Sequence, residues 1–490
     1  MLSWIHVLEW RAVTTPDTVA LSDQYGGELT YAALAARLER AAAGYAAAGL
    51  APGDVVALLA RNRVEWAVSL FGLVRAGALP VLINWRLTAA EIDAVLAPAA
   101  ARIVVADEAC AKLVDRPVLP LLPEAVGLPV PERPVERLRG AEPLVLLHTS
   151  GTTGRPKLVP ISHEMLVAAA TFMKLSVPEA REGARHLSAL PLFHAAGLAN
   201  LAYALFTGGH LHLLDGFSPA AFVDELAGRR IELTQLVPTL IGAVVTEVAG
   251  RTARPDLSGL VEVVYGASPI QPELLARAVR TLGCRFRQNY ASTETGPLPM
   301  STLPPGAHDP ALGRLATAGR PSLGWEVRLG EHDEIQVRGA IPFPGYWNDP
   351  EPTRQASTSD GFYRTGDIGS FDADGYLTIV DRLTDMIVSG GENVHPAEVE
   401  AVLIGHPGVR EVAVIGVPDD RWGESVHAVV VARGSLDPDA LAGWARERLA
   451  GYKCPTGMTL VAELPRNATG KILKGPLREP FWAGRDRRVS

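Results

Sequence analysis

The sequence predicts an α/β protein, with a large N-terminal domain of α/β layers plus a small β subdomain, and a small α+β C-terminal domain. Its 490 residues allow two to four domains, at roughly 100–200 residues per domain. Short apolar runs alternate with amphipathic helical runs up to about residue 300. Short β-like runs broken by Gly and Pro then follow to about residue 380, before a compact mixed pattern of roughly a hundred residues.

The N-terminal alternation is typical of βαβ units that build a mostly parallel sheet. One predicted helix carries its apolar residues on a single face, at positions 34, 38, 41 and 45. Apolar strands are predicted at 55–60, 79–83, 103–106 and 144–147. The Pro-rich stretch 116–134 predicts a surface connection, and the apolar run 187–206 predicts buried core and pocket wall.

Later elements follow the same reasoning. Strands at 334–338 and 375–380 belong to the β subdomain, which we expect over residues 313–380. The C-terminal domain is predicted to contain a helix from Pro396, strands at 411–417 and 426–431, and a helix at 437–449.

Composition excludes several classes of protein. Hydrophobic residues make up 48% and charged residues 20%, which is typical of a folded protein rather than a disordered one. A net charge of -8 argues against a protein built to bind nucleic acid or anionic lipid. The cysteines, at 110, 284 and 454, form no zinc or disulfide pattern and suit a reducing compartment. With no signal peptide or membrane span evident, we expect a cytoplasmic protein.

The strongest motif is His148-Thr-Ser-Gly-Thr-Thr-Gly-Arg-Pro-Lys157, which follows an apolar run. Such a loop offers many N–H and O–H donors to polyphosphate oxygens, and Lys157 adds a positive charge. It is not a Walker A loop, because Pro156 and Leu158 stand where that motif needs Gly and a hydroxyl residue. By itself the string also fits a turn-rich surface loop.

Further motifs follow in order: Tyr265-Gly-Ala-Ser268, Gln288-Asn-Tyr-Ala-Ser-Thr-Glu294, Tyr363-Arg-Thr-Gly-Asp367, Asp381-Arg382 with Gly390-Gly-Glu-Asn393, and Pro465-Arg-Asn-Ala-Thr-Gly-Lys471. With them the chain resembles the adenylate-forming superfamily of acyl-CoA synthetases, peptide-synthetase adenylation domains and firefly-type luciferases, over essentially its whole length. The resemblance implies binding of ATP by the loop residues Thr149, Ser150, Gly151, Thr152, Thr153 and Lys157.

The resemblance also implies the other nucleotide contacts. Asp367 suits the ribose, because a carboxylate accepts hydrogen bonds from two vicinal hydroxyls. Glu294 fits a Mg²⁺ ligand, with Thr153, because nucleotide-bound magnesium takes only one or two protein carboxylates. Arg382 resembles the arginine that contacts phosphate and ribose. The adenine side is expected to involve Gly266, Ala267, Ser268, Asn289, Tyr290 and Thr293.

Lys471 is the predicted catalytic cation. A carboxylate must attack an α-phosphate although both are negative, and an ammonium that touches both lowers the repulsion. In the family the small C-terminal domain is mobile: it delivers this lysine, then rotates to place the loop of Gly390 and Gly391 beside the pantetheine path. The implied boundaries are 1–381 for the large domain, 382–385 for the hinge and 386–490 for the small domain. Thr384 stands where the family usually has Asp or Lys.

The acyl pocket is expected around Pro191-Leu-Phe-His-Ala-Ala-Gly197, where His194 resembles the residue near the substrate carboxylate. A core histidine is the alternative. The small residues at 195–197 and 199 leave room for a bulky or ring-bearing acid, and larger groups at 235–240 could refill it. An amino acid is not expected, since no Asp is present to pair with an ammonium. His210 and His212 could share a strand face as metal ligands, but they lack a third ligand.

Together these features predict an ATP-dependent acid:CoA ligase that uses Mg²⁺ and coenzyme A and activates a hydrophobic, bulky or ring-bearing carboxylic acid. Three alternatives stay open: an acyl-AMP ligase that loads a carrier-protein phosphopantetheine, a luciferase-like oxygenase, and a non-catalytic nucleotide-binding protein. A homodimer is an expectation from the family alone.

Overall fold

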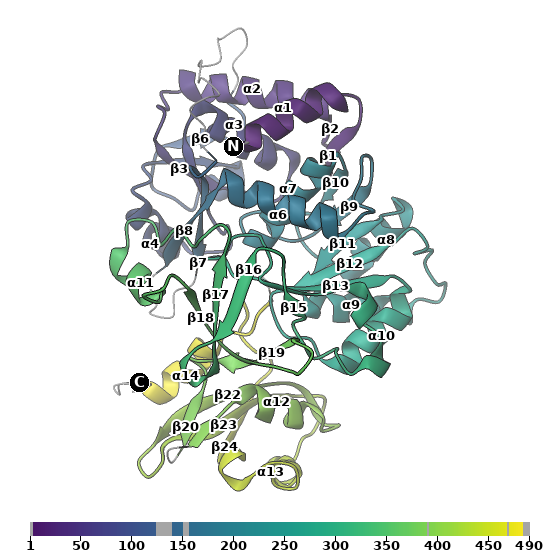
Figure 1. Ribbon diagram of the computed structural model, residues 1–490, viewed down its shortest axis with the longest axis vertical. Helices are drawn as coiled ribbons and strands as arrows, with labels where there is room; N and C mark the ends of the chain where they lie inside the picture. Colours follow the sequence, from purple (N-terminus) through teal and green to yellow (C-terminus); the bar gives the residue numbers. More distant parts are fainter. Residues whose placement is uncertain (1–2, 124–139, 150–155, 390–391, 468–469, 484–490) are drawn as a thin grey trace. The chain divides into compact units, whose positions relative to one another are not determined.

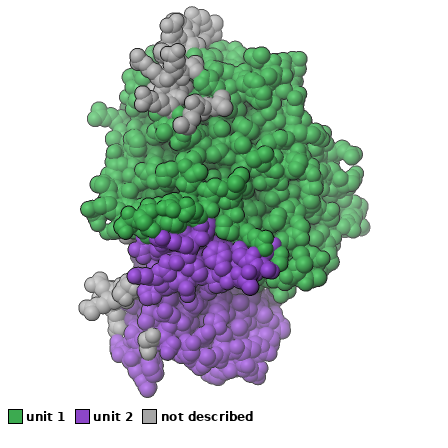
Figure 2. All heavy atoms as spheres, viewed as in Figure 1, with its two compact units in different colours: residues 1–326, 337–363 green, residues 327–336, 364–490 purple. Residues whose placement is uncertain are grey.

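The computed structural model describes residues 3–123, 140–149, 156–389, 392–467 and 470–483 (Figure 1). Contacts divide the chain into two compact units (Figure 2). Unit 1 contains residues 1–326 and 337–363, and unit 2 contains residues 327–336 and 364–490. The hinge at 382–385 remains a prediction.

One sheet of unit 1 has six strands in the order β6-β5-β3-β4-β7-β8, which confirms the predicted strands at 55–60, 79–83, 103–106 and 144–147. The surface connection predicted at 116–134 is wrong for residues 118–120, which form β6 and pair in parallel with β5 at the sheet edge, where prolines are tolerated. Residues 124–134 of that prediction lie outside the described residues. The strands are β3 (Val55–Leu59), β4 (Leu79–Leu82), β5 (Ile103–Ala106), β6 (Val118–Pro120), β7 (Pro143–Thr149) and β8 (Lys157–Ser162).

Helices accompany this sheet in the predicted alternation. The apolar positions at 34, 38, 41 and 45 are all buried on α2, as the helical spacing predicts. The helices of this region are α1 (Trp4–Thr14), α2 (Tyr31–Ala47), α3 (Val64–Ala76), α4 (Ala89–Ala99) and α5 (Glu108–Ala111).

The second sheet of unit 1 has nine strands in the order β15-β14-β13-β12-β11-β9-β10-β1-β2. Its central strands are parallel, so their carboxyl ends meet at one edge, where ligands bind in open α/β sheets. The strands are β1 (Val19–Asp23), β2 (Glu28–Thr30), β9 (Arg185–Ser188), β10 (His210–Leu213), β11 (Leu233–Leu236), β12 (Glu262–Gly266), β13 (Arg285–Tyr290), β14 (Ser301–Leu303) and β15 (Arg320–Pro321).

Helices pack on both faces of this sheet. A large apolar core joins one face to three helices, α8 (Pro219–Gly228), α9 (Pro238–Gly250) and α10 (Pro272–Leu282). Next to the sheet, α6 (His163–Ser176) and α7 (Ala195–Thr207) lie side by side (Figure 1). Most of α7 is buried, which confirms that the run 187–206 is interior. No helix among the described residues is long and apolar enough to cross a bilayer.

The β subdomain predicted over residues 313–380 contains a four-stranded sheet in the order β16-β17-β18-β19. The boundary between the two units falls within three of its strands. The elements of this region are β16 (Trp325–Leu329), β17 (Glu334–Gly339), α11 (Pro350–Gln355), β18 (Tyr363–Phe371) and β19 (Leu377–Arg382).

The remainder of unit 2 is the predicted α+β pattern, built on a sheet in which β22 and β23 form a long hairpin. Alternate apolar residues of this hairpin pack against α12 and α13 in one core. The elements are β20 (Ile387–Ser389), β21 (Glu392–Val394), α12 (Pro396–Ile404), β22 (Val409–Asp419), β23 (Gly423–Ala432), α13 (Pro438–Arg446), β24 (Gly457–Leu460) and α14 (Lys474–Trp482).

Candidate active site

In unit 1, a lysine, a tyrosine and a glutamate from three distant parts of the chain lie together. Lys157, the first residue of β8, has its Nζ 4.6 Å from the centre of the Tyr346 ring. The Tyr346 hydroxyl donates a hydrogen bond of 3.1 Å to Glu294 Oε1. The Trp347 N–H donates to the Leu158 carbonyl at 2.8 Å, which ties the Tyr346 segment to β8. A cation and a carboxylate, the groups a nucleotide–magnesium complex needs, thus both contact the Tyr346 side chain.

A tight turn presents Glu294. The Ser292 N–H donates to Thr295 Oγ1 at 3.2 Å, and the Thr295 N–H donates to Ser292 Oγ at 3.3 Å. The Gly296 N–H closes the turn on the Thr293 carbonyl at 3.0 Å. Ser and Thr side chains commonly stabilise such turns by bonding to nearby backbone. Glu294 therefore projects from a fixed backbone just after β13.

The segment predicted to lie along adenine follows β12 at the carboxyl edge of the sheet. Gly266 pairs with Asn289, and a Cβ atom at Gly266 would lie 2.2 Å from the Asn289 carbonyl oxygen, so only glycine fits. Ala267 has a φ of +69°, in the left-handed region. Asn289 Oδ1 accepts from Thr302 Oγ1 at 3.2 Å, and Tyr290 is buried. Strand pairing thus fixes both segments at one edge.

His194 is the N-cap residue of α7, and its Nε2 is buried with no hydrogen-bond partner among the described residues. Burial first, then the positive charges of His148 and Arg86, lower the pKa of His194 to about 4. The ring is therefore neutral at pH 7 and keeps one nitrogen available to a substrate group.

The start of α7 approaches the preceding loop closely. A Cβ atom at Gly197 would lie 2.0 Å from the Pro191 carbonyl oxygen. We expect Gly197→Ala to displace the first turn of α7, with His194, and to lower the Tm measured by thermal denaturation. Gly250→Ala is the matched control, because a Cβ there meets nothing within 4 Å and alanine stabilises helices. An equal Tm for Gly197→Ala and the wild type would contradict the close approach.

In unit 2, Asp367 and Arg382 face each other across β18 and β19. They are register partners, and Arg382 Nε lies 3.0 Å from Asp367 Oδ1. The Asp367 side chain is buried, whereas 48% of the Arg382 side chain is exposed. Thr365 and Gly366 lie within β18 just before Asp367, and Thr365 Oγ1 accepts a hydrogen bond of 3.1 Å from the Asp367 N–H.

Lys471 lies in the same unit. Its N–H donates to Asn467 Oδ1 at 2.9 Å, which fixes the backbone at this residue. Burial lowers the pKa of Lys471 to about 8, helped by the charges of Arg382 and Lys474 and opposed by Asp367 and Asp385. These interactions place Lys471 in the electrostatic environment of the Asp367–Arg382 pair.

Comparison with known proteins gives the family. The model of the AMP-binding enzyme family matches residues 8–347, and that of the AMP-binding enzyme C-terminal domain matches residues 398–471. The chain belongs to the AMP-binding enzyme family. A feruloyl-CoA synthase from Amycolatopsis is 39% identical to this AMP-binding enzyme over 96% of this chain and 97% of its own. A fatty acid–acyl-carrier-protein ligase from Streptomyces coeruleorubidus is 34% identical over 99% and 98%.

Solved structures agree. The o-succinylbenzoate CoA synthetase of Bacillus subtilis, in complex with its acyl-adenylate intermediate, has a TM-score of 0.86 and 30% identity, covering 97% of this chain and 98% of its own. Another structure of that synthetase contains ATP and a magnesium ion. The predicted superfamily, the α/β fold class and the activity of an ATP-dependent acid:CoA ligase are confirmed for this AMP-binding enzyme. The acids named for its relatives differ, so they do not specify its own.

The structure brings some of the predicted site residues of this AMP-binding enzyme together in three sets. Unit 1 brings together Lys157 and Glu294, and separately pairs Gly266 with Asn289. Unit 2 brings together Asp367, Arg382 and Lys471. Ser150, Gly151, Thr152, Thr153, Gly390 and Gly391 lie outside the described residues. Thr149 ends β7 opposite Lys157, so the two described ends of the glycine-rich loop are register partners.

Sequence reasoning missed two residues of the AMP-binding enzyme. Tyr346 carries the hydrogen bond to Glu294, and the available signal was Pro344-Gly345 before it, where Gly345 has a φ of +88°. Asp385 forms an ion pair with Arg478, and both are largely buried. Burial acts to raise the pKa of Asp385, but the charges of Lys474 and Arg478 outweigh it and lower the pKa. No motif spacing marks that pair.

The described residues contain no group of three or more His, Cys, Asp or Glu side chains that could hold a metal ion. His210 and His212 do share a strand face, but both rings hydrogen-bond to Ser22 Oγ, at 2.7 and 2.8 Å. A magnesium ion bound mainly by a nucleotide requires fewer protein ligands. The single carboxylate of Glu294 fits that requirement.

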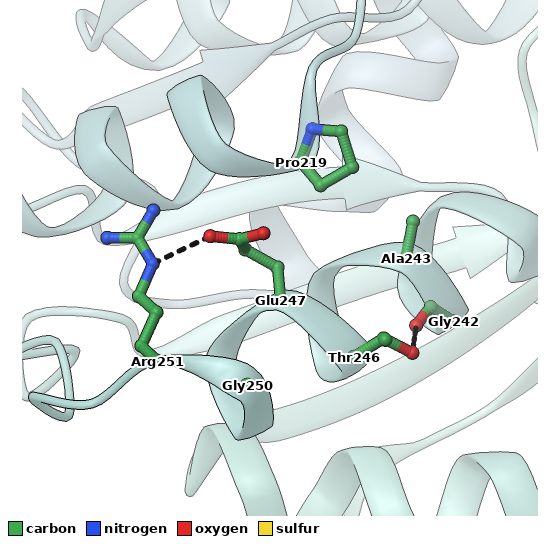
Figure 3. A pocket seen from close by; sticks show the side chains of 7 residues that line it. All are labelled: Pro219, Gly242, Ala243, Thr246, Glu247, Gly250 and Arg251. Carbon is green, nitrogen blue, oxygen red and sulfur yellow. Dashed lines mark hydrogen bonds and ion pairs between the residues drawn. The ribbon is translucent and has the colours of Figure 1, made fainter.

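A surface depression of about 450 Å³ lies between α8 and α9 (Figure 3). Its Arg251 is held by Asp224 and Glu247, at 2.6 and 2.9 Å, so its charge is already neutralised. None of the predicted site residues lines it. The depression is therefore no part of the candidate active site of this AMP-binding enzyme.

Proposed function

We propose that the enzyme joins a carboxylic acid to coenzyme A in two steps, with the residue roles given below. In the first step, a carboxylate oxygen attacks the α-phosphorus of ATP, pyrophosphate leaves and acyl-AMP forms. In the second, the coenzyme A thiol releases its proton, its sulfur attacks the acyl carbonyl, the thioester forms, and AMP leaves with the electrons of the broken C–O bond. The observation that carries the proposal is the partly buried ammonium of Lys471 in the electrostatic environment of the Asp367–Arg382 pair.

Lys471 serves the first step. Two anions must approach each other, and a buried cation lowers that repulsion more strongly than a hydrated one. Asp367 would accept hydrogen bonds from the ribose hydroxyls, while the exposed guanidinium of Arg382 would donate to phosphate or ribose oxygens. Both roles rest on the buried carboxylate and the half-exposed arginine of this pair.

Glu294 would hold the magnesium ion, which supplies charge neutralisation to the phosphates when bound. The hydrogen bond from Tyr346 orients one carboxylate oxygen and leaves the other available. Lys157 supplies a second cation for the phosphates. On the adenine side, Gly266, Ala267 and Ser268 would lie along the base with Tyr290 against it, while Asn289 and Thr293 fix the neighbouring backbone.

The neutral His194 would orient the acid. Because its pKa is lowered to about 4, the ring is uncharged at pH 7 and forms no ion pair that would make the substrate carboxylate less reactive. Its buried Nε2, unpartnered among the described residues, can instead make one hydrogen bond to the carboxylate or carbonyl.

The deciding experiment measures pyrophosphate release by the purified enzyme with Mg·ATP and a panel of fatty, aryl and dicarboxylic acids, with and without coenzyme A. Multiple turnovers that require coenzyme A and yield an acyl-CoA support the proposal. A single turnover in the presence of coenzyme A would favour a carrier protein as the acceptor. The similar ligase from Streptomyces coeruleorubidus is named for such an acceptor. Absence of release with every acid would contradict both.

The rate of adenylation should depend on pH through Lys471. Its pKa is lowered to about 8, so the ammonium is present below that pH and is lost as the pH rises through it. We expect acid-dependent pyrophosphate release to fall above about pH 8, well below the ordinary lysine pKa of about 10.4. An arginine keeps its charge at these pH values, so the remaining activity of Lys471→Arg should not fall between about pH 8 and pH 10. A wild-type limb near pH 10 would contradict the role.

Tyr346→Phe removes only the hydroxyl that bonds to Glu294. A hydrogen bond to a charged group contributes about 1.5–3 kcal/mol, so we expect the KM for Mg·ATP to rise on the order of tenfold. The matched control is Tyr25→Phe, which removes a tyrosine–aspartate hydrogen bond of 2.6 Å to Asp215. Unchanged kinetics for Tyr346→Phe at limiting magnesium would argue against Glu294 as the metal ligand.

Three further points belong to the proposal. Residues 382–385, between a large domain at 1–381 and a small one at 386–490, act as the hinge, and the loop of Gly390 and Gly391 serves the second step. The enzyme works in the cytoplasm, with a small-molecule acid, ATP and coenzyme A as its partners. A homodimer is the expected assembly, which light scattering of the purified protein would test.

A further inference from the structure

Two polar side chains on α7 are buried without a hydrogen-bond partner. Asn200 is 5% exposed and Tyr203 is 6% exposed. Neither Asn200 Oδ1 nor the Tyr203 hydroxyl has a partner among the described residues. Three residues apart on a helix, the two side chains lie on the same face. Buried polar groups are nearly always paired in native proteins, so two on one face indicate a binding partner.

The sheet opposite this face of α7 is polar as well. The Tyr203 ring packs with Leu233 and makes an edge contact of 5.4 Å with the His186 ring. His186 and Leu233 are register partners, and side chains two residues apart share a face. Register partners in neighbouring strands point to the same face of a sheet, and so do residues two positions apart in one strand. The register of β11, β12 and β13 therefore places further polar residues on the face toward α7: Gln235, Glu262, Arg287 and Asn289.

Contacts of β13 with α6 support this assignment. Arg287 donates to the Ser176 carbonyl at 2.6 Å, and Asn289 Nδ2 lies 3.6 Å from Met173 Sδ. The opposite face of the same strands carries Leu187, Val263, Tyr265 and Phe286 in the apolar core. The sheet is thus apolar toward α8, α9 and α10, and polar toward α6 and α7.

Charges on the polar face are already balanced. Arg287 pairs with Glu262 at 2.8 Å, and Arg285 pairs with Glu179 at 2.6 Å. A second carboxylate on the substrate would find no unpaired cation in this cluster. Burial raises the pKa of Tyr203, so its hydroxyl stays neutral and can both donate and accept. A neutral hydroxyl group suits these surroundings better than a charged one.

The spacing along α7 sets the size of the acid. Asn200 and Tyr203 come six and nine residues after His194, which is about 9 Å and about 14 Å along the helix axis. Between His194 and Asn200, Ala196 and Ala199 are small and partly exposed, whereas most of α7 is buried. A three-carbon acid chain in line with a benzene ring covers a comparable length.

We propose, on the basis of the proposed function, that Asn200 and Tyr203 form a hydrogen-bonding floor for the far end of the acyl group. They select ring-bearing acids with a phenolic hydroxyl over the same acids without it. The hydroxyl supplies the partner that both side chains lack, and an amide such as Asn200 can donate or accept as the phenol requires. A purely apolar chain would leave both groups unpaired.

The test compares 4-hydroxycinnamic acid with cinnamic acid, which differ only in the hydroxyl. The ratio of their kcat/KM values for CoA-thioester formation is measured in the wild type, Asn200→Leu and Tyr203→Phe. We expect the wild type to favour the hydroxylated acid by at least about tenfold, as sites that bind a hydroxyl do. Each variant should bring the ratio close to one, mainly through a lower value for the hydroxylated acid.

Thr207→Val is the matched control. Its hydroxyl lies one turn further along α7 but already donates to the Tyr203 and Ala204 carbonyls, at 3.0 and 3.1 Å. This variant should keep the wild-type ratio. Tyr203→Phe retains the ring that packs on His186, so folding should be preserved, which thermal denaturation checks.

The outcomes separate this inference from the proposed function. Equal kcat/KM values in the wild type, or a ratio unchanged in both variants, would overturn the inference while thioester formation continued. Preference for a fatty or a dicarboxylic acid would overturn it in the same way. Absence of thioester from every acid would overturn the proposed function, and the inference with it.

Discussion

Lys471→Ala is expected to lower acid-dependent pyrophosphate release on the order of 10²–10³-fold, as the loss of one well-placed electrostatic group does. The ammonium is partly buried and interacts with the charges of Asp367 and Arg382, so solvent screens it less than a surface lysine. Its removal should lower kcat for adenylation far more than it changes the KM for ATP, because the charge matters most as the two anions meet. Thioester formation from synthetic acyl-AMP, measured separately, should be much less affected.

The control for this variant follows from the structure. From the motif alone, Lys474→Ala would be expected to change little. Lys474, however, pairs with Glu400 at 2.7 Å, and its charge helps to lower the pKa of Lys471. Lys453→Ala is the cleaner control, because Lys453 pairs with Glu398 at 2.8 Å and does not contribute to that pKa. Equal losses for Lys471→Ala and Lys453→Ala would remove Lys471 from the mechanism.

Asp367→Ala is expected to raise the KM for Mg·ATP about 10²-fold, since hydrogen bonds to a charged group contribute about 1.5–3 kcal/mol each. Two ribose hydroxyls would lose their common acceptor. Arg382 would lose its ion-pair partner, but its half-exposed side chain can turn to water, so folding should survive. The measurement is the ATP dependence of acid-stimulated pyrophosphate release.

Asp374→Ala provides the comparison for Asp367. Asp374 is an exposed aspartate in the turn between β18 and β19, so the two variants remove the same group from the same hairpin. We expect wild-type kinetics for it. If the two variants raised the KM equally, the effect would come from the hairpin and not from recognition of ribose.

Part of the candidate site could be predicted from local sequence. The hydrogen bond between Thr365 and Asp367 and the strand before the glycine-rich loop are set by a few neighbouring residues. The contacts of Tyr346 with Glu294 and Lys157 could not be predicted. They join residues 52 and 189 positions apart, and only the path of the chain decides such distances.

The prediction of a hydrophobic acid illustrates the same limit. The apolar residues of α7 and the small residues after His194 indicated an apolar wall of the acyl pocket. Asn200 and Tyr203 are polar residues within that run. Their shared helix face, and the polar face of the sheet opposite, emerge only when strand register is known.

The sequence by itself determined the family, the order of the elements and the residue types of the adenylation chemistry, because each depends on short motifs and on hydrophobic periodicity. The tertiary structure alone decided which groups meet, how deeply they are buried and which charges act on them. The lowered pKa of Lys471 is the clearest case. Burial and the charges of Arg382 and Lys474 act through space, and spacing along the chain does not encode them.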